Sequence, residues 1–520
     1  MTDTEATEVA QTRTVAVVGT GTMGQGIAQV ALVAGHPVRL YDSDAARADQ
    51  AVGAVLGRLD RLVEKGRMAP EERVAAAARL HRADTLGDLA DAALVVEAIV
   101  ERLDVKRELF AALEKIVGDD CLLATNTSSL SVTAIAGALR LPGRFVGMHF
   151  FNPAPLLPLV EIVSGFATDE TSATRAYATA KAWGKTPVRC ADTPGFIVNR
   201  IARPFYAEAL RVYEERGADP ATVDAVLRES GGFRMGPFEL TDLIGQDVNE
   251  AVTRSVWEAF HHDPKFTPSL AQRRLVESGR LGRKTGHGWF PYGDGAEGPR
   301  ARTEPPAPAP ESVILHGDLG HAQPLVALIE HAGVKVRRKK QGSHLTLPGG
   351  GQLSLADGET SFEYTDEEIV YFDLALDYTT AGRIALSTAA TTSPETLREA
   401  VGLFQAIGKE VSVIGDVPGM IVARTVALMV DLAVDAVERG VATAEDIDTA
   451  MRLGVNYPAG PTEWAAKLGY QWVAGVLGAL HERYPTGRYA RCPGVVRRSY
   501  EEETAAAART GRAVKDKDSR

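Results

Sequence analysis

A short apolar run followed at once by a glycine-rich loop constrains the fold of this chain more than any other feature. The run Thr14–Val18 is rich in β-branched residues, which is typical of a buried parallel strand. The loop Gly19–Gly24 reads GTGTMG, and helical spacing continues over Gln25–Ala34. A second apolar run, Val38–Tyr41, follows. This order predicts the strand, loop, helix and strand of a doubly wound α/β sheet.

The residues of this loop are also those that a dinucleotide site needs. Glycines permit a tight turn and let a pyrophosphate approach the backbone at a helix N-terminus. Asp42 comes directly after the second run, where a carboxylate can accept hydrogen bonds from both ribose hydroxyls and would repel a 2′-phosphate. The sequence therefore predicts an N-terminal Rossmann domain that binds NAD in preference to NADP.

Two helical stretches interrupt the minimal nucleotide-binding unit. They lie around Ala46–Glu64 and Pro70–Leu80, and we expect them to form an inserted helical hairpin. The basic residues of this hairpin are Arg58, Arg61, Lys65 and Arg67. They are either a binding surface for a phosphorylated substrate or, as is more usual, a solvated helix face.

A polar run follows a later predicted strand of the same sheet. The strand covers Cys121–Ala124 and leads into Asn126–Ser129. Polar side chains at the carboxyl end of a parallel strand face the crevice in which ligands bind. Ser129 and Ser131 are candidates to cap the next helix, whereas Ser128 is the better candidate for a ligand contact.

One histidine and one glutamate occupy an otherwise apolar, proline-punctuated segment, RFVGMHFFNPAPLLPLVE. A β-rich run delivers His149 to a strand end, Asn152 and the prolines force a turn, and the next apolar run carries Glu161 back. A buried carboxylate fixes the tautomer of an imidazole and raises its basicity, which suits a general base acting on an alcohol. The alternative is a core histidine satisfied by the backbone.

Composition limits the classes of function. At 520 residues the chain is expected to form two to four domains. A net charge of −11 argues against nucleic acid or an anionic membrane as the main partner. The sequence has no apolar run long enough to span a bilayer and no signal-peptide layout, and its three cysteines are widely separated. We expect a cytoplasmic protein without a metal site.

The second half of the chain repeats the first. The segment Asp192–Arg200, DTPGFIVNR, returns as Asp416–Arg424, DVPGMIVAR, and the offset in numbering is 416 − 192 = 224. The motif GPFE at Gly236 returns as GPTE at Gly460, with the same offset. A match of this length predicts an internal duplication.

The second copy lacks the residues expected to work in the first. Ala423 replaces Asn199, and no HFFNP motif recurs. The predicted strand Val313–Leu315 leads to HGDLG instead of a glycine loop, and we expect His316 to be structural. The basic run Arg337–Lys340, followed by LTLPGGG from Leu345, is typical of a solvated hairpin. The second nucleotide-like half is therefore predicted to be degenerate.

These observations predict an α/β chain with the following domains. They are a Rossmann domain with its helical-hairpin insertion over residues 1–190, an all-α domain over 191–295, a linker over 296–311, a degenerate Rossmann-like domain over 312–415, a second all-α domain over 416–500 and a flexible tail over 501–520.

Seven stretches together resemble the 3-hydroxyacyl-CoA dehydrogenase family. In the family's order the chain carries VAVVGTGTMGQGIAQ, LYD, VVEAIVERLDVK, ATNTSSL, GMHFFNPAP with PLVEIV, DTPGFIVNR and GRKTGHGWF. The resemblance implies NAD-dependent oxidation of an (S)-3-hydroxyacyl-CoA. The two-copy architecture resembles enzymes of phenylacetate-type catabolism that act on 3-hydroxyadipyl-CoA, with 3-hydroxybutyryl-CoA as the alternative substrate.

The resemblance also implies roles for individual residues. His149 is the expected base, Glu161 its orienting partner, and Ser128 and Asn199 the contacts of the reacting oxygen. The expected cofactor contacts are Gly19, Gly21, Thr22, Met23, Gly24, Asp42, Glu101, Lys106, Asn126 and Asn152.

The family resemblance has two further implications. Its helical domain is a pairing surface, so we expect a homodimer or an intramolecular pseudo-dimer, with acyl-CoA as the other partner. From another class of function, a non-catalytic NADH-binding protein, like the lens crystallins related to this family, is the alternative.

Overall fold

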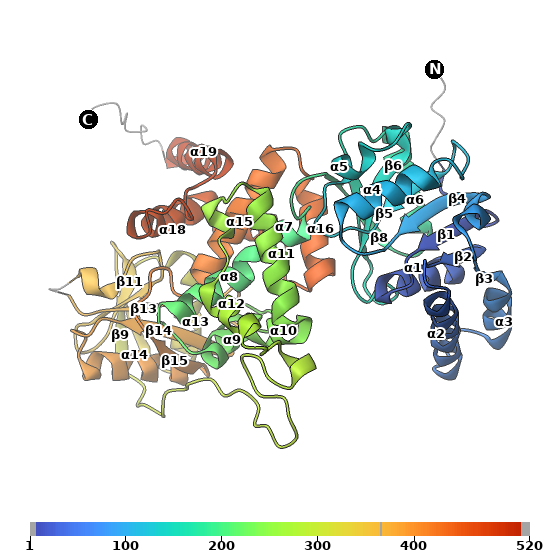
Figure 1. Ribbon diagram of the computed structural model, residues 1–520. Helices are drawn as coiled ribbons and strands as arrows, with labels where there is room; N and C mark the ends of the chain where they lie inside the picture. Colours follow the sequence, from blue (N-terminus) through green and yellow to red (C-terminus); the bar gives the residue numbers. More distant parts are fainter. Residues whose placement is uncertain (1–6, 365–366, 511–520) are drawn as a thin grey trace. The chain divides into compact units, whose positions relative to one another are not determined.

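The computed structural model describes residues 7–364 and 367–510, which form two compact units (Figure 1). The first unit holds the residues up to Arg200 together with Arg439–Val455, and the second holds Ile201–Glu438 together with the residues from Asn456 onward. The predicted helical domain over residues 416–500 is therefore not one compact body. Its segment 439–455 packs instead on the sheet of the first unit.

The first unit is built on an eight-stranded sheet in the order β3-β2-β1-β4-β5-β6-β7-β8. Strand β7 runs antiparallel to β6 and parallel to β8, whereas β1 is parallel to both of its neighbours. The strands are β1 (Thr14–Val18), β2 (Val38–Tyr41), β3 (Leu80–Arg82), β4 (Ala92–Glu97), β5 (Leu122–Thr125), β6 (Phe145–Phe150), β7 (Leu159–Ser164) and β8 (Thr186–Ala191).

Helices cover this sheet. Every residue of β1, β4 and β6 is buried, as expected for strands that are covered on both faces. The helices are α1 (Thr22–Val33), α2 (Ala45–Glu64), α3 (Pro70–Arg79), α4 (Leu103–Leu113), α5 (Val132–Ala136), α6 (Glu170–Ala182), α7 (Val198–Ile201) and α16 (Ala444–Val455). Helices α2 and α3 form the predicted hairpin and lie beside β3 (Figure 1).

The second unit contains a smaller, mixed sheet in the order β10-β9-β11-β12-β13-β14-β15. Strand β11 pairs antiparallel with both β9 and β12, and β13 pairs antiparallel with β14. The strands are β9 (Ser312–Gly317), β10 (Lys335–Lys339), β11 (Ser343–Thr346), β12 (Gln352–Leu355), β13 (Ile369–Phe372), β14 (Arg383–Thr388) and β15 (Glu410–Ile414). This sheet is the degenerate Rossmann-like domain that the sequence predicted.

The remaining helices belong to the second unit. They are α8 (Arg203–Glu214), α9 (Pro220–Glu229), α10 (Pro237–Ile244), α11 (Gln246–Ala259), α12 (Leu270–Glu277), α13 (Pro324–His331), α14 (Pro394–Ala406), α15 (Val422–Glu438), α17 (Pro461–Leu468), α18 (Tyr470–Arg483) and α19 (Pro493–Thr510).

Two local predictions in this unit are corrected. A hairpin forms where β11 and β12 pair antiparallel, but the basic run Arg337–Lys340 is not part of it. Strand β10 pairs in parallel with β9, and its charged side chains suit the edge of a sheet. The tail expected from residue 501 is helical as far as Thr510, and residues 511–520 lie outside the described residues. His316 lies in β9, where its Nε2 is 3.0 Å from Thr346 Oγ1.

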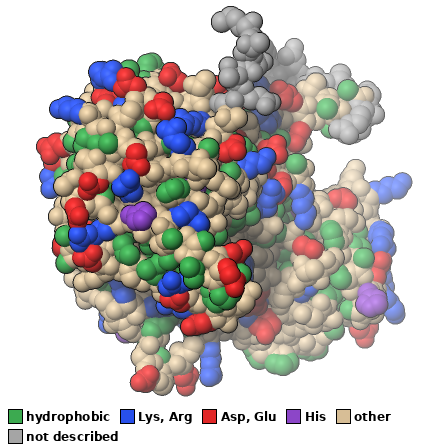
Figure 2. Space-filling model, turned by 90° about the vertical axis from the view of Figure 1, so that its right-hand side faces the viewer, with side chains coloured by type: hydrophobic (Ala, Val, Ile, Leu, Met, Phe, Trp, Pro, Cys, Tyr) green, Lys and Arg blue, Asp and Glu red, His purple; other side chains and the backbone are tan. Residues whose placement is uncertain are grey.

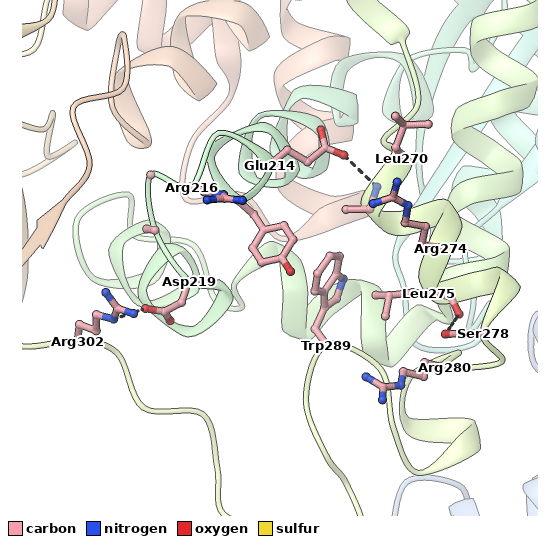
Figure 3. A pocket seen from close by; sticks show the side chains of 14 residues that line it. Glu214, Arg216, Asp219, Leu270, Arg274, Leu275, Ser278, Arg280, Trp289 and Arg302 are labelled. Carbon is pink, nitrogen blue, oxygen red and sulfur yellow. Dashed lines mark hydrogen bonds and ion pairs between the residues drawn. The ribbon is translucent and has the colours of Figure 1, made fainter.

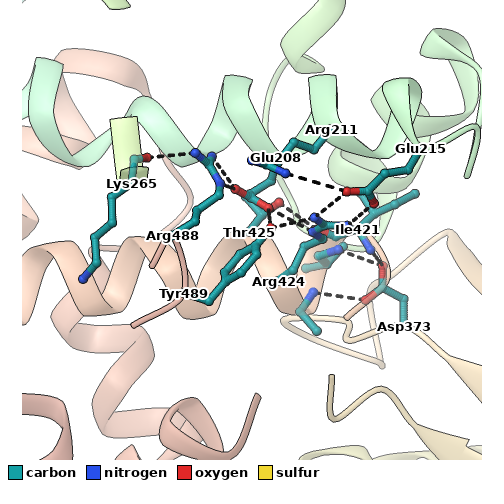
Figure 4. Close-up of polar contacts among 12 residues, drawn as sticks. Glu208, Arg211, Glu215, Lys265, Asp373, Ile421, Arg424, Thr425, Arg488 and Tyr489 are labelled. Carbon is teal, nitrogen blue, oxygen red and sulfur yellow. Dashed lines mark hydrogen bonds and ion pairs between the residues drawn. The ribbon is translucent and has the colours of Figure 1, made fainter. Parts of the chain in front are cut away.

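The two helical copies contact each other inside the second unit. Helix α15 of the second copy packs against α8 of the first, and nearly all of its side chains are buried. Buried charges join them (Figure 4). The Glu208 carboxylate accepts hydrogen bonds from Arg424 Nε at 2.9 Å, Arg488 Nε at 2.8 Å and the Tyr489 hydroxyl at 2.6 Å.

This network keeps a buried carboxylate charged. Burial opposes the ionisation of Glu208, but the charges of Arg488 and Arg424 lower its pKa to about 2. Arg424 also pairs with Glu215 at 3.0 Å. Removing either partner of such a buried pair would leave an uncompensated charge.

Figure 2 shows basic and acidic side chains interspersed over the face that it draws. Among the described residues, none of the helices has both the length and the apolar character needed to cross a membrane.

Candidate active site

The glycine loop between β1 and α1 combines two constrained positions with one open position. Gly19 has φ +96°, and a Cβ there would lie 2.5 Å from Ala98 O. A Cβ on Gly24 would lie 1.9 Å from Gly19 O, so the chain itself requires both glycines. Around Gly21, by contrast, no atom lies within 4 Å of an added Cβ. The backbone is therefore bare where α1 begins, as close approach of a pyrophosphate requires.

Asp42 lies beside this loop, and Thr22 and Met23 open α1. The Asp42 Oδ2 accepts hydrogen bonds from the Thr20 amide at 3.0 Å and the Thr20 hydroxyl at 2.7 Å, and its Oδ1 accepts one from the Asp44 amide at 3.1 Å. Burial raises the pKa of Asp42, but these hydrogen bonds bring it below its usual value. A fixed anion at this position favours a free ribose 2′-hydroxyl over a 2′-phosphate.

A buried charge cluster supports the loop after β5. Lys106 Nζ lies 2.5 Å from Glu97 and 3.2 Å from Glu101. Glu101 Oε1 in turn accepts hydrogen bonds from the amides of Ser128 and Ser129 at 3.0 and 3.1 Å. Burial opposes the ionisation of Glu101, but the charge of Lys106 and the loop hydrogen bonds lower its pKa. Lys106 was expected as a cofactor contact. In the structure its side chain is buried and pairs with Glu101.

The predicted histidine and glutamate meet. His149 on β6 and Glu161 on β7 are directly opposite each other in the antiparallel pair, and His149 Nδ1 lies 2.6 Å from Glu161 Oε2. The His149 side chain is 7% exposed and that of Glu161 is fully buried. With Nδ1 donating to the carboxylate, Nε2 is the ring nitrogen that keeps a lone pair.

The other oxygen of Glu161 fixes the next element of the site. Glu161 Oε1 accepts hydrogen bonds from the amides of Ile197 and Val198 at 3.1 and 2.9 Å, where α7 begins. Asn199 follows directly, and its Nδ2 lies 3.4 Å from Ser128 O. One carboxylate therefore positions both the imidazole and the helix that carries the Asn199 amide.

Asn126 and Asn152 lie just beyond the ends of β5 and β6. Asn126 Oδ1 accepts a hydrogen bond from the Phe150 amide at 2.8 Å, which ties the end of β5 to the residue after His149. Asn152 is exposed in the turn that follows β6, and its peptide bond to Pro153 is cis.

Sequence reasoning missed the side chains that surround these groups. The ring centroids of Phe151 and Phe196 lie 4.5 and 5.7 Å from that of His149. In the sequence, only their places in the motifs HFFNP and DTPGFIVNR could have indicated this contact. Asp192 accepts hydrogen bonds from the Ser131 hydroxyl and the Thr133 amide, both at 2.7 Å.

The two serines proposed as helix caps differ in the structure. Ser131 caps α5 by accepting a hydrogen bond from the Ala134 amide at 3.0 Å. Ser129 is not a cap, because its hydroxyl donates to Glu101.

Comparison with known families identifies these domains. Residues 14–193 match the profile described as 3-hydroxyacyl-CoA dehydrogenase, NAD binding domain, and residues 195–292 and 419–514 both match the C-terminal domain of the same family. The chain belongs to the 3-hydroxyacyl-CoA dehydrogenase family. It is thus an NAD-dependent oxidoreductase, and the second match to the C-terminal domain confirms the duplication of the helical domain.

Three relatives of this dehydrogenase match either nearly the whole chain or about half of it. It is 44% identical to the 3-hydroxyadipyl-CoA dehydrogenase of Escherichia coli K12 over 92% of this chain and 96% of the relative. A solved structure named 3-hydroxybutyryl-CoA dehydrogenase from E. coli K12 is 41% identical, with a TM-score of 0.87 over 95% of this chain and 99% of that one. The (S)-3-hydroxybutyryl-CoA dehydrogenase structure from Ralstonia eutropha is 38% identical, with a TM-score of 0.53 over 54% of this chain and all of that one.

The degenerate domain of this dehydrogenase also has a match. Residues 353–418 match a profile described as 3-hydroxybutyryl-CoA dehydrogenase reduced Rossmann-fold domain. Asp373 of this domain is the counterpart of His149 at the offset of the duplication and is fully buried. Its carboxylate accepts hydrogen bonds from the amides of Ile421, Val422 and Ala423 at 3.0, 2.8 and 3.1 Å.

The dehydrogenase also has a hollow of about 990 Å³ in its second unit (Figure 3). The rings of Tyr213 and Trp289 meet edge to face in its lining, with centroids 5.0 Å apart. Its lining also includes four arginines, Arg216, Arg274, Arg280 and Arg302. None of the predicted catalytic or cofactor-binding residues lines this hollow, so we assign it no part in the reaction.

Proposed function

We propose that this dehydrogenase oxidises (S)-3-hydroxyadipyl-CoA to 3-oxoadipyl-CoA, with His149 as the base. The observation that carries the chemistry is the 2.6 Å contact between His149 Nδ1 and Glu161 Oε2, which leaves Nε2 free for a substrate hydroxyl. The acyl group is inferred from the relative named 3-hydroxyadipyl-CoA dehydrogenase, which matches almost the whole chain. The runner-up substrate, 3-hydroxybutyryl-CoA, is supported by the matching solved structure that bears the name of that activity.

Each site residue then has a defined task. His149 Nε2 removes the proton of the 3-hydroxyl group, and Glu161 stabilises the imidazolium that forms. The Ser128 hydroxyl and the Asn199 amide hold the reacting oxygen. Because Glu161 also fixes the start of α7, the base and the Asn199 amide are positioned together before substrate arrives.

The N-terminal loop is the proposed holder of NAD. Gly21 and the first residues of α1, Thr22 and Met23, would receive the pyrophosphate, and Asp42 would receive the ribose hydroxyls. When bound, NAD accepts the hydride from the substrate carbon. Glu101 and Asn126 are proposed to border the nicotinamide end, since both are fixed at the carboxyl ends of β4 and β5.

A panel of acyl-CoA substrates tests the proposed specificity. We expect kcat/KM for 3-hydroxyadipyl-CoA to exceed that for 3-hydroxyhexanoyl-CoA by ~10-fold or more. A site that pairs the terminal carboxylate of the substrate is left with an unpaired polar group when the substrate lacks that carboxylate. The hexanoyl compound is the matched control, because it has the same chain length and lacks only the terminal carboxylate. NADH formation at 340 nm is the measurement.

Three outcomes distinguish the alternatives. Equal values for the two six-carbon substrates would contradict recognition of the carboxylate, and a preference for 3-hydroxybutyryl-CoA would establish the runner-up. No absorbance change with NADH and acetoacetyl-CoA would revive the non-catalytic NADH-binding alternative.

The duplicated helical domain supports a proposal about assembly. We infer that the contact of α8 with α15 forms inside one chain the pairing that half-length relatives would need two chains to make. Sedimentation equilibrium of the full chain should then give the monomer mass of 55.5 kDa, whereas twice that mass would indicate the alternative homodimer. A cytoplasmic location stays a prediction, supported by three free, buried cysteines.

A further inference from the structure

The second copy contributes a helix to the unit that holds the candidate active site. Helix α16 lies against β7 and β8, and the Ala191 amide at the end of β8 donates to Val441 O at 2.8 Å. The exchange is reciprocal, because in the second unit the Gly415 amide donates to Gly217 O at 2.7 Å. The residues of the two bonds correspond to one another at the offset of the duplication. Each nucleotide-like domain is thus covered by a segment of the other copy.

Gly454 lies at the contact between α16 and this sheet. A Cβ at this position would lie 2.7 Å from Leu159 Cδ2, 3.1 Å from Val198 Cγ2 and 3.8 Å from Phe151 Cε1. Leu159 is fully buried and Val198 is 2% exposed, so neither side chain can move aside into solvent. A side chain at position 454 would therefore displace the residues of the first copy.

All three neighbours of Gly454 adjoin the His149 and Glu161 pair. Leu159 and Glu161 are two residues apart on β7 and so point to the same face of the strand. The Val198 amide donates to Glu161 Oε1 at 2.9 Å. The Phe151 ring lies 4.5 Å from the His149 ring. A shift at position 454 would therefore reach both members of the pair.

The matched position in the other half shows that helix packing alone does not require glycine. Ser230 is the counterpart of Gly454 at the offset of the duplication, and its hydroxyl donates to Arg383 O at 2.6 Å. Arg383 in turn is the counterpart of Leu159. A side chain is thus accommodated at this contact in the copy that has no His149 and no Glu161 equivalents.

We propose that Gly454 of the second copy is a positioning residue for the active site of the first. By seating α16 against Leu159, Val198 and Phe151, it holds Glu161 in register with His149 and with the start of α7. The second copy then supports the residues that hold the working site in place, in addition to any role in pairing. The proposal rests on the proposed function, in which His149 is the base.

Substitution by leucine tests this proposal in the full-length enzyme. Leucine is a strong helix former, so G454L adds bulk without loss of helix propensity. We expect kcat to fall by ~10- to 100-fold, while the Kd for NADH, measured by fluorescence titration, stays within ~2-fold. The variant G454A adds only the Cβ and should show a smaller loss of kcat. It replaces G454L in the test if G454L fails to fold.

A second substitution distinguishes positioning from general damage. In the double variant G454L/L159A the shortened neighbour makes room for the leucine, and kcat should return to within ~3-fold of that of L159A alone. S230L is the matched control in the other half, and G475L is the surface control, since no atom lies within 4 Å of a Cβ at Gly475. Both controls should keep the kcat of the wild type.

The outcomes that would overturn the proposal are distinct from those that would overturn the function. A folded G454L enzyme with unchanged kcat would refute it, and so would equal losses of kcat in G454L and S230L. If H149Q keeps its activity, the proposed function fails whatever happens at position 454. If H149Q is inactive and G454L is normal, only the role of Gly454 fails.

Discussion

The two copies of the duplicated chain solve the same structural problem with different residues. In both, a helix begins inside the protein, and its first amide groups need a buried acceptor. In the first copy Glu161 provides that acceptor from β7 and keeps one oxygen for His149. In the second copy Asp373 stands at the position of His149, and Ala385 stands at the position of Glu161.

The difference shows which interactions the scaffold needs and which only the chemistry needs. Buried amides at a helix start are costly when they are left without an acceptor, so the second copy keeps a carboxylate. Asp373 uses both oxygens to accept from the amides of Ile421, Val422 and Ala423.

The rest of the scaffold is kept in both copies. Lys185 Nζ donates to Leu157 O at 3.0 Å, and its counterpart Lys409 donates to Ala381 O at 2.6 Å. The second copy therefore has no counterpart of His149 but keeps these hydrogen bonds of the scaffold.

The largest effect is expected from removal of the proposed base, His149, which has no counterpart in the second copy. His149→Gln should lower kcat by ~100- to 10⁴-fold, because a placed general base contributes that much to a proton transfer. The Kd for NADH should change little, since the glycine loop and Asp42 are untouched. Steady-state kinetics and NADH fluorescence titration measure the two quantities. Equal losses of turnover and NADH binding would point to a collapsed fold and break the comparison.

A smaller loss is expected when the first copy is given the residue of the second at the start of α7. Asn199→Ala reproduces Ala423 and removes one of the hydrogen-bond donors proposed to hold the reacting oxygen. We expect kcat to fall by ~100- to 1,000-fold, as is usual when one donor to a developing oxyanion is lost. The reverse change, Ala423→Asn, is the control and should leave kcat as it is. A rise in KM with an unchanged kcat would assign Asn199 to ground-state binding instead.

Much of the first copy could be predicted from its sequence because its signals are local. The bounds of β1 and β2 coincide with the predicted runs Thr14–Val18 and Val38–Tyr41. The prolines between His149 and Glu161 required the chain to return, and a buried imidazole needs a partner, so their meeting followed from spacing and chemistry.

The placement of α16 could not be predicted in this way. An apolar pattern shows which face of a helix is buried but not which sheet covers it. Gly454 is one of 50 glycines, and nothing in its local sequence marks it as a contact. The strand β10 was not predicted because its basic residues fit both the edge of a sheet and a solvated hairpin.

The link between the copies can be weakened without touching the chemistry. Glu208→Gln would leave Arg424 and Arg488 buried without their charged partner, and we expect the free energy of unfolding to fall by ~3–5 kcal/mol at pH 7. The remaining folded enzyme should keep its kcat. Urea unfolding followed by circular dichroism is the measurement.

The dependence on pH provides the internal check for this network. The pKa of Glu208 is lowered to about 2 in the folded chain, so its stabilisation is present above the unfolded pKa near 4.5. It is lost as pH falls from there toward 2, and the gap between wild type and Glu208→Gln should narrow over that window. A constant gap would mean that the variant is destabilised by packing alone.

The smallest effect is expected at Asp373, where the pKa is shifted in the opposite direction from that of Glu208. Burial raises the pKa of Asp373 to about 6, against the opposing amide hydrogen bonds. The protonated form is therefore favoured by folding, so its contribution to stability is full below the unfolded pKa near 3.8 and is lost as pH rises through about 6. Asp373→Asn cannot ionise, but its single amide oxygen leaves part of the helix start unsatisfied. These effects oppose each other, and we expect a change of only ~1 kcal/mol in stability at pH 7.

The decisive readout at Asp373 is the slope with pH. Between pH 4 and 6 the wild type should lose more stability than Asp373→Asn, and subtracting the two unfolding curves removes the contribution of other groups, such as Asp224, whose pKa is raised to about 7. The kcat of Asp373→Asn should equal that of the wild type at every pH. A loss of turnover in this variant would show that the second copy still takes part in the chemistry, and the contrast between a working and a purely structural carboxylate would fail.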